Sequence, residues 1–596
     1  IGVRMMDWLN LYKDVIALDF EFVAADGERQ RPICLVTKSL KTGDQTRLWV
    51  EEGMQCPLPL GPKYLYVAYF ASAEWNCFLS LGWGLPARII DLYPEYRRMT
   101  NGAVGYATRS GYGLLAAAGA FGVATMDANH KTDMRELIMS GGPWSTEEQT
   151  DILEYCAYDV TITANLFRQM WPKIATDQLA LTQALLRGRY TVAVAKMEFS
   201  GTPLDTELFA SLVPHWPELC LHLIEAVDQD YGVYEGSTFK QAKFDGWVAA
   251  QAIPWPQTDR GKLKLDEATF RQMSKSHTQV APLHELRVTL AQMRTLKLHI
   301  GADGRNRTLI SPFAAKTSRN QPSTTKFIFG NSAWLRSLIK PEEGHGLAYV
   351  DYSSQEIAIA AALSGDPKMW QAYESGDPYM AFAIQAGLAP EGATKASHKE
   401  VRNRCKQIVL GVGYGMGAEA LALGAGIHRV EANGLLNSHK MTYRVFWKWA
   451  EANQMRALMG EPLVTPLGWK IQLRGDPDPN DRSLLNWPMQ STGADIMRLA
   501  ACMLTEAGIE VCCPIHDAFL VRFPLAEEID VIAKTTKLMV DASEIVMGQG
   551  YACRVDADIV RYPDRYMDER GEVMFSRVMT LLDMLRAKER PKPAHS

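Results

Sequence analysis

The C-terminal half of the chain contains three short segments whose residue types could carry out phosphoryl transfer. Asp351 follows the apolar run 346–350, and Asp517 follows His516 between two alternating apolar runs. Between the two aspartates, cationic, apolar and aromatic residues recur every four positions: Arg402, Lys406, Leu410 and Tyr414. Two carboxylates that can hold Mg²⁺, with a cationic helix that can hold a triphosphate, meet the needs of nucleotidyl transfer.

Strand ends and one helix are expected to position these groups. Residues 346–350 predict a strand that ends at the first aspartate. Residues 509–513 and 519–523 alternate apolar and other side chains, which predicts a hairpin with the second aspartate near its turn. The four-residue spacing places the two cations on one face of a helix.

Structural roles could explain single members of this set. Ser353 is expected to open a helix, and Glu356 three residues later would complete a capping box. A lone aspartate in a hairpin turn commonly serves the turn itself. Two such aspartates together with a cationic row favour a catalytic site over separate structural roles.

A second acidic constellation lies near the N-terminus. Residues 12–50 predict strands, and alternation places Asp19 and Glu21 on one face of the first strand. Tyr155 and Asp159 are four residues apart in a predicted helix, so they share a face. Short strands and helices over residues 63–170 predict an α/β unit. The alternative is that these side chains only end secondary elements.

Composition bounds the protein class. The 596 residues, 47% apolar and 22% charged, predict a globular chain of several domains. A net charge of -5 means that any nucleic-acid surface must be local. Residues 287–326 are a candidate for such a surface, although a solvated face would explain their charge equally well. The basic residues of this stretch are Arg287, Arg294, Lys297, Arg305, Arg307, Lys316, Arg319 and Lys326.

Cysteine spacing and hydropathy exclude other classes. Ten scattered cysteines without a C-x-x-C pair fit a reducing compartment and argue against a zinc site. The small-residue apolar run 114–126 is too short to span a bilayer.

Further helices are expected between the two constellations. Residues 177–233 predict a long helical stretch, 237–266 predict loops with short elements, and 283–300 predict another helix. Pro488 is expected to kink a helix or start a new one.

The three C-terminal segments resemble motifs A, B and C of family A DNA polymerases. Supporting segments resemble the same family over roughly residues 180–570: Thr317-Ser318-Arg319, Thr465-Pro-Leu-Gly468, and Arg482, Asn486 and Gln490 in an R-x3-N-x3-Q pattern. The resemblance implies a multidomain α/β and α+β fold, in which a right-hand polymerase of palm, fingers and thumb follows a ribonuclease H-like 3′–5′ exonuclease.

The resemblance also implies roles for the polymerase residues. Asp351 and Asp517, with the Tyr352 carbonyl, would hold two Mg²⁺ ions, for which Mn²⁺ is an alternative. Lys406 joins these aspartates as a catalytic residue. The expected dNTP contacts are Arg402, Lys406, Leu410, Tyr414, Tyr379 and Glu356, the last as a gate against a ribose 2′-hydroxyl. The expected DNA contacts are Arg319, Arg482, Asn486, Gln490 and His516.

The N-terminal constellation resembles a DEDDy 3′–5′ exonuclease. The resemblance implies metal binding by Asp19, Glu21, Glu74 and Asp159, with Tyr155 as the catalytic residue that orients the attacking water. Glu74 stands where the family has aspartate. Asp91 matches another family aspartate and is the fallback ligand.

Departures from the family pattern suggest a divergent, phage-like branch. Leu410 replaces an aromatic residue, Tyr379 replaces a histidine, and Ala518 replaces the glutamate of the usual H-D-E. The glutamate is not one of the two strict metal ligands, so activity is expected to survive.

The expected domain order follows from the resemblance. It places an exonuclease at 1–175, thumb and connecting helices at 176–310, palm at 311–366 and 451–596, and fingers at 367–450. A 5′-nuclease domain is not expected. The expected partners are primer–template DNA and dNTPs, and no association with a membrane is expected. The protein is expected to be a monomer in the cytoplasm of a bacterial or phage-infected cell.

Three alternatives remain. The chain could be a non-catalytic DNA-binding scaffold on a polymerase fold, although the two aspartates and Lys406 argue against it. It could be a nuclease whose C-terminal half only grips DNA. It could also belong to a phage branch that prefers 2-aminoadenine.

Overall fold

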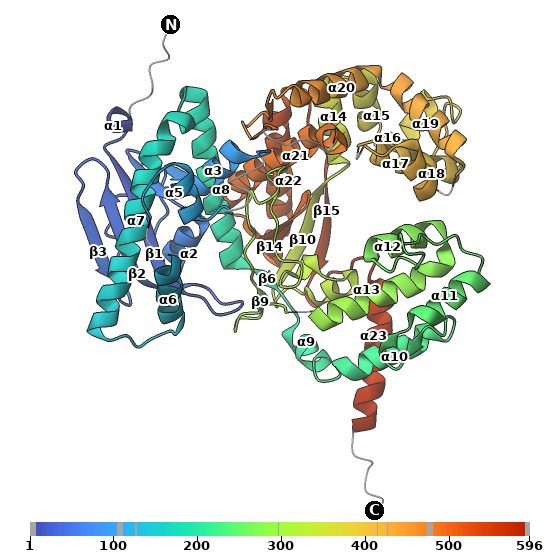
Figure 1. Cartoon of the computed structure of the whole chain (residues 1–596), viewed down its shortest axis with the longest axis horizontal. Coiled ribbons are helices and arrows are strands. Elements are labelled where there is room, and N and C mark those ends of the chain that lie inside the picture. Colours follow the sequence, from blue (N-terminus) through green and yellow to red (C-terminus); the bar gives the residue numbers. More distant parts are fainter. Residues whose placement is uncertain are drawn as a thin grey trace, which may run out of the picture.

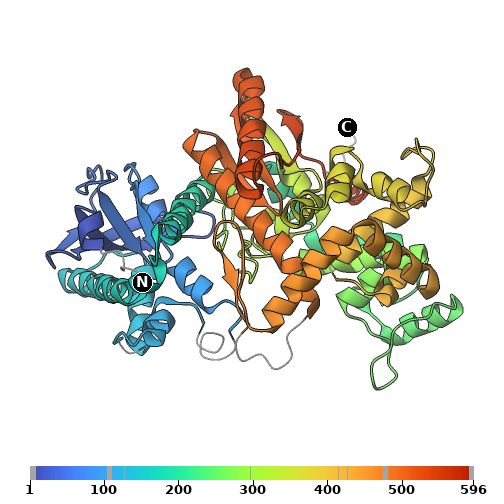
Figure 2. The ribbon, with the colours of Figure 1, turned by 90° about the horizontal axis from the view of Figure 1, so that it is seen from above.

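The computed structural model describes residues 8–103, 111–125, 128–295, 297–413, 415–425, 427–473 and 481–589. Two sheets organise the chain, one near the N-terminus and one in the C-terminal half (Figure 1). Viewed from above, the N-terminal sheet lies at one end of the molecule, green and gold helices from the middle of the chain lie at the other, and the red and orange C-terminal helices stand between them (Figure 2).

The N-terminal sheet has the strand order β3-β2-β1-β4-β5, with β1 antiparallel to β2 and parallel to β4. Its strands are β1 (Asp14–Val23), β2 (Arg31–Ser39), β3 (Gln45–Trp49), β4 (Tyr64–Ala68) and β5 (Ile89–Asp91). The surrounding helices are α1 (Trp8–Leu11), α2 (Ser72–Ser80), α3 (Leu92–Thr100), α5 (Leu114–Ala120), α6 (Ala128–Met139) and α7 (Thr146–Ile174). Each face of β1 is buried, one under α7 and the other toward α2.

Helix α8 (Gln178–Ser200) lies between the two sheets. It packs against α2 and β5 on one side and against α21 (Asp481–Glu506) and β13 (Glu510–Ile515) on the other. Gly188 allows the closest approach, since a Cβ built there would lie 2.1 Å from the carbonyl oxygen of Ile89. The first helix of the stretch that the sequence analysis assigned to the thumb therefore joins the two halves of the protein.

The central sheet has the order β13-β14-β10-β15 and is antiparallel throughout. Its other strands are β10 (His345–Tyr352), β14 (Ala518–Pro524) and β15 (Val555–Arg561). Helices α21 and α22 (Glu528–Met547) pack against each other and share one large core with this sheet. The short elements of this half are β11 (Leu463–Val464), β12 (Lys470–Ile471), η2 (Ile328–Gly330), η3 (Ala333–Leu338) and η4 (Leu525–Glu527).

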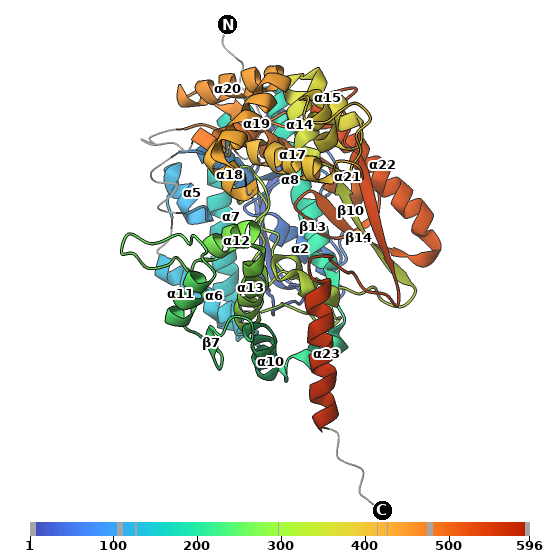
Figure 3. The same ribbon diagram turned by 90° about the vertical axis from the view of Figure 1, so that its right-hand side faces the viewer.

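Two helical groups flank the central sheet, one above and one below in Figure 3. The upper group comprises α14 (Gln355–Ser364), α15 (Pro367–Glu374), α16 (Pro378–Gln385), α17 (Lys399–Gly413), α18 (Ala418–Ala425), α19 (Arg429–Thr442) and α20 (Arg444–Leu458). The lower group comprises α9 (Thr206–Leu212), α10 (Trp216–Asp228), α11 (Gln241–Ala250), α12 (Glu267–Ser276), η1 (Thr278–Val280), α13 (Ala281–Thr295) and α23 (Glu572–Glu589). The remaining strands are β6 (Thr202–Pro203), β7 (Tyr234–Glu235), β8 (Thr238–Phe239) and β9 (Arg305–Asn306).

Most predicted elements are present, with three corrections. The helical stretch 177–233 is broken at Gly201, whose φ of 69° ends α8 before the short strand β6. The helix expected to reach residue 300 ends at Thr295. Pro488 does not start a new helix, because α21 continues through it between buried neighbours on both sides.

Within the described parts of the chain, no helix combines the length and the apolar character needed to cross a membrane.

Candidate functional site

The central sheet brings Asp351 and Asp517 together. Asp351 lies in β10 directly opposite Ala518 of β14, and the backbone N–H of Tyr352 donates to the carbonyl oxygen of Asp517 at 3.1 Å. Burial, with help from Asp517, raises the pKa of Asp351 to about 6, and burial also raises the pKa of Asp517. Two half-buried carboxylates that repel each other create a site where a bound cation is favoured.

Two further carboxylates adjoin Asp351 from β15, and the sequence analysis missed them. Asp556 lies directly opposite Asp351 in the antiparallel pairing, and both Asp556 and Asp558 raise the pKa of Asp351. The alternating acidic residues at 556 and 558 are visible in the sequence, but only the pairing of β15 with β10 shows whose neighbours they are.

The predicted capping box after Asp351 is wrong. Ser354, not Ser353, precedes α14; it adopts the left-handed conformation at φ 52° and makes no side-chain cap hydrogen bond. The Ser353 hydroxyl donates instead to Asp556, a partner that is distant in sequence. Glu356 is consequently free of a capping role.

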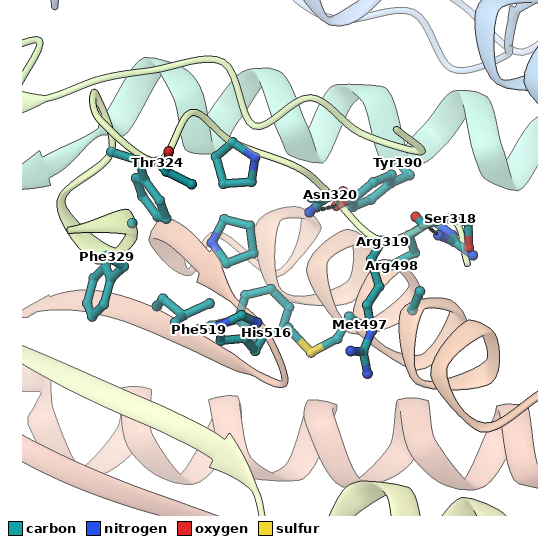
Figure 4. A pocket seen from close by; sticks show the side chains of 16 residues that line it. Tyr190, Ser318, Arg319, Asn320, Thr324, Phe329, Met497, Arg498, His516 and Phe519 are labelled. Carbon is teal, nitrogen blue, oxygen red and sulfur yellow. Dashed lines mark hydrogen bonds between the residues drawn. The ribbon is translucent and has the colours of Figure 1, made fainter. Parts of the chain in front are cut away.

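Arg319 connects Glu356 with Asp517. Its Nη2 lies 3.3 Å from Glu356 Oε1, and its charge lowers the pKa of Asp517 against the effect of burial. Arg319 and His516 line one cavity of about 210 Å³ (Figure 4). His516 is exposed at the hairpin turn with φ 49°.

Helix α17 carries the two predicted cations beside this site. Arg402 is half-buried and Lys406 is exposed, while an adjoining face of the helix buries Cys405, Ile408 and Val412. The helix was thus predicted correctly up to residue 413. Tyr414 lies outside the described residues.

Tyr379 lies between the two cations. The guanidinium carbon of Arg402 is 5.4 Å and Nζ of Lys406 is 5.7 Å from the centroid of its ring. Burial raises the pKa of Tyr379. The structure therefore places three of the predicted dNTP contacts next to one another.

Glu356, Leu410 and Asn486 line a second, smaller cavity of about 40 Å³. Asn486 is buried on α21, and its Oδ1 has no hydrogen-bond partner among the described residues. Gln490 lies one turn further along the same helix and is half-buried. The side chain of Arg482 lies outside the described part of the chain.

Residues 264–557 match the family model for DNA polymerase family A. This part of the chain is a family A DNA polymerase domain. DNA polymerases of Mycobacterium phages L5 and D29 are 24% and 26% identical to the chain over 429 and 432 residues. DNA polymerase I of Aquifex aeolicus is 24% identical over 444 residues.

The chain spans about two thirds of the length of the phage relatives that it matches. The phage matches span 68% and 67% of this chain but only 66% of each relative. A solved structure, the POL domain of Pol1 from M. smegmatis in complex with DNA primer-template and dNTP, covers 92% of this chain and is itself covered to 94%, with a TM-score of 0.69 and 17% identity. This likeness extends the shared fold beyond the polymerase domain to almost the whole chain.

The N-terminal carboxylates also converge. Asp19 and Glu21 lie on β1, and Tyr155 and Asp159 lie one turn apart on α7, where Tyr155 shares a hydrogen bond with Asp159. Burial raises the pKa of Glu21, and Asp19, Asp159 and Glu74 raise it further. Such mutual repulsion is typical of a site that binds cations.

Glu74 reaches this cluster from α2. It is 3% exposed, its Oε2 accepts a hydrogen bond from the backbone N–H of Phe20 at 2.8 Å, and burial followed by Asp19 raises its pKa. Asp91, the fallback ligand, instead caps α3 and accepts from the backbone N–H groups of Phe70, Ala71 and Tyr93 at 2.9 Å. Both oxygens of Asp91 are therefore occupied by backbone N–H groups. Glu74 fits the fourth carboxylate position better than Asp91 does.

Cys156 is a neighbour that the sequence analysis missed. Its thiol donates to the Asp19 carbonyl at 3.3 Å, and the ligand atoms of Asp19, Glu21 and Cys156 lie within 4.8 Å of one another. Burial raises the pKa of the thiol, which therefore remains an S–H donor. Its place beside Tyr155 in the Y-x3-D segment was the available signal.

Two arginines of the basic stretch 287–326 are neutralised inside the protein. Arg305 pairs with Glu342 at 2.6 Å and with Glu510 at 2.8 Å, and Arg307 pairs with Asp303 at 2.5 Å. These arginines hold loops to the central sheet. Arg319 differs from them because its carboxylate partner, Glu356, belongs to the candidate site.

Proposed function

We propose that the chain is a template-directed DNA polymerase that adds dNTPs to a primer 3′ end, with a 3′–5′ exonuclease in its N-terminal part. The observation that carries the polymerase proposal is the meeting of Asp351 and Asp517 at the end of the central sheet of a family A domain. The phage relatives favour a replicative phage enzyme, with primer–template DNA and dNTPs as partners.

The donor set fits Mg²⁺, which prefers carboxylate and carbonyl oxygens. Asp351, Asp517 and the Tyr352 carbonyl would hold two such ions, which when bound would activate the primer 3′-hydroxyl and neutralise the triphosphate. Arg402 and Lys406 would bind the phosphate oxygens. Glu356, held by Arg319, would exclude a 2′-hydroxyl, and His516 and Arg319 would contact the primer end in the cavity that they share.

The N-terminal cluster supports the exonuclease proposal. Asp19, Glu21, Glu74 and Asp159 would share the metal ions, and the Tyr155 hydroxyl would orient the attacking water. Cys156, through its thiol, would hold the backbone of Asp19 in place. The domain limits 1–175, 176–310, 311–366, 367–450 and 451–596 are proposed as a working division, with α8 as the bridge between the first and the last.

A Mg²⁺ titration of primer extension tests the polymerase proposal. Asp351→Asn should lose at least about a thousandfold in kcat, because one of two metal ligands is neutralised. Asp564→Asn changes an exposed aspartate in the loop before α23 and should behave as the parent protein. Equal extension by all three proteins would refute the assignment of Asp351.

A further inference from the structure

Asp377 lies at the start of α16, beside the two cations of α17. It is the N-cap of α16, and its Oδ1 accepts a hydrogen bond from the backbone N–H of Met380 at 3.1 Å. Its other oxygen, Oδ2, accepts a hydrogen bond from Nε of Arg402. The helix cap thus fixes the carboxylate, and the carboxylate fixes the guanidinium.

This contact uses one edge of the guanidinium only. An arginine has five N–H donors, one on Nε and four on the two terminal nitrogens. Neither terminal nitrogen of Arg402 donates a hydrogen bond to any residue that the structure describes. Both remain available for the bidentate contact that guanidinium makes with phosphate.

The ring of Tyr379 restricts the same guanidinium from another direction. Arg402 and Lys406 both lie within cation–π distance of this ring, at 5.4 Å and 5.7 Å from its centroid. Lys406 has no carboxylate partner in the described parts of the chain. Of the two cations, Arg402 alone is therefore oriented by an anion.

We propose that Asp377 is a positioning residue for nucleotide binding, which holds Arg402 by Nε so that its terminal nitrogens face the triphosphate. The inference rests on the proposed polymerase function. A carboxylate that competed with phosphate would occupy the terminal nitrogens in the bidentate arrangement. The contact through Nε alone favours positioning over competition.

Steady-state primer extension with varied dNTP concentration tests this role. Asp377→Asn keeps an oxygen that can cap α16 but removes the charge that orients Arg402. The KM for dNTP should rise about tenfold while kcat changes less than about threefold. Asp266→Asn is the matched control, since Asp266 is an exposed N-cap of α12 whose side chain forms no salt bridge with any described residue. It should leave both constants unchanged.

A double-mutant cycle separates positioning from a general structural effect. In an Arg402→Ala background, Asp377→Asn should change kcat/KM by less than about twofold, because the group through which it acts is gone. If Asp377→Asn does not fold, as judged by thermal unfolding beside the control, Asp377→Ser keeps a capping hydroxyl and replaces it in every comparison.

The outcomes are distinct. An unchanged KM overturns the inference, and so does a lowered KM, which would show that the carboxylate competes with the triphosphate. Full additivity with Arg402→Ala also overturns it. If the parent protein extends no primer, the proposed polymerase function itself fails. If the parent extends the primer and the Asp377 variants do so with unchanged constants, that function stands and the inference alone fails.

Discussion

Asp351→Asn is expected to stabilise the metal-free protein at neutral pH. The folded state raises the pKa of Asp351 from 3.8 to about 6, chiefly by burial and then through Asp517, Asp556 and Asp558. Folding therefore favours the protonated carboxyl, and the ionised form opposes folding. Stability from this group is present below the unfolded pKa and is lost as pH rises through about 6.

The size of the effect follows from the shift. Two pKa units correspond to about 3 kcal/mol. Because Asp351 is only half-buried, solvent screening reduces this to about 1 kcal/mol of unfolding free energy. For a chain of 596 residues that unfolds as one unit, that change corresponds to a rise in Tm of about 1 °C.

Thermal unfolding in the presence of a chelator measures this difference. The Tm of Asp351→Asn should exceed that of the parent protein at about pH 7.5. The gap should shrink as pH falls through about 6 and close below 3.8, where Asp351 is protonated in both the folded and the unfolded state. Added Mg²⁺ should raise the Tm of the parent more than that of the variant. The reasoning would be refuted if the two proteins had the same Tm at neutral pH, or if their difference in Tm were largest in acid. It would also be refuted if Asp564→Asn showed the same difference from the parent.

Three further substitutions have defined outcomes. Ser318→Gly should raise the unfolding free energy by about 1 kcal/mol, measured as a Tm increase, because Ser318 has φ 60° and a buried hydroxyl without a partner among the described residues. Gly188→Ala should lower the Tm, at a cost of about 1–3 kcal/mol, because its Cβ would meet the carbonyl of Ile89 at 2.1 Å. Glu356→Ala should increase ribonucleotide incorporation at least about tenfold, because the gate and the ion pair with Arg319 are both removed. Alkaline cleavage of the extended primer measures this incorporation. Unchanged sugar selectivity of Glu356→Ala, a higher Tm for Gly188→Ala or a lower Tm for Ser318→Gly would each contradict the reasoning for that variant.

The sequence predicts best where structure is local. The apolar run before Asp351 and the alternating residues around Asp517 each specify a strand, and antiparallel pairing then brings the two carboxylates together. The four-residue spacing of Arg402 and Lys406 specifies a shared helix face in the same way. These inferences need only the periodicities of strands and helices.

Periodicity does not predict contacts between segments that are distant in the sequence. The local pattern at Ser353 predicts a cap, but its hydroxyl bonds to Asp556 in a strand that the pattern does not include. The role of Asp377 depends on how α16 packs on α17, and the thiol of Cys156 meets Asp19 only because α7 covers β1. None of these pairings leaves a periodic signal in the sequence.

A labelled primer annealed to a template, incubated with Mg²⁺ in the presence and absence of four dNTPs, tests the central claim that the chain has two separate active sites. The account predicts that the parent protein extends the primer with dNTPs and shortens it without them. Asp517→Asn should lose only extension, and Asp159→Asn should lose only shortening. A parent that extends nothing, or a single substitution that abolishes both activities in a folded protein, would contradict the account.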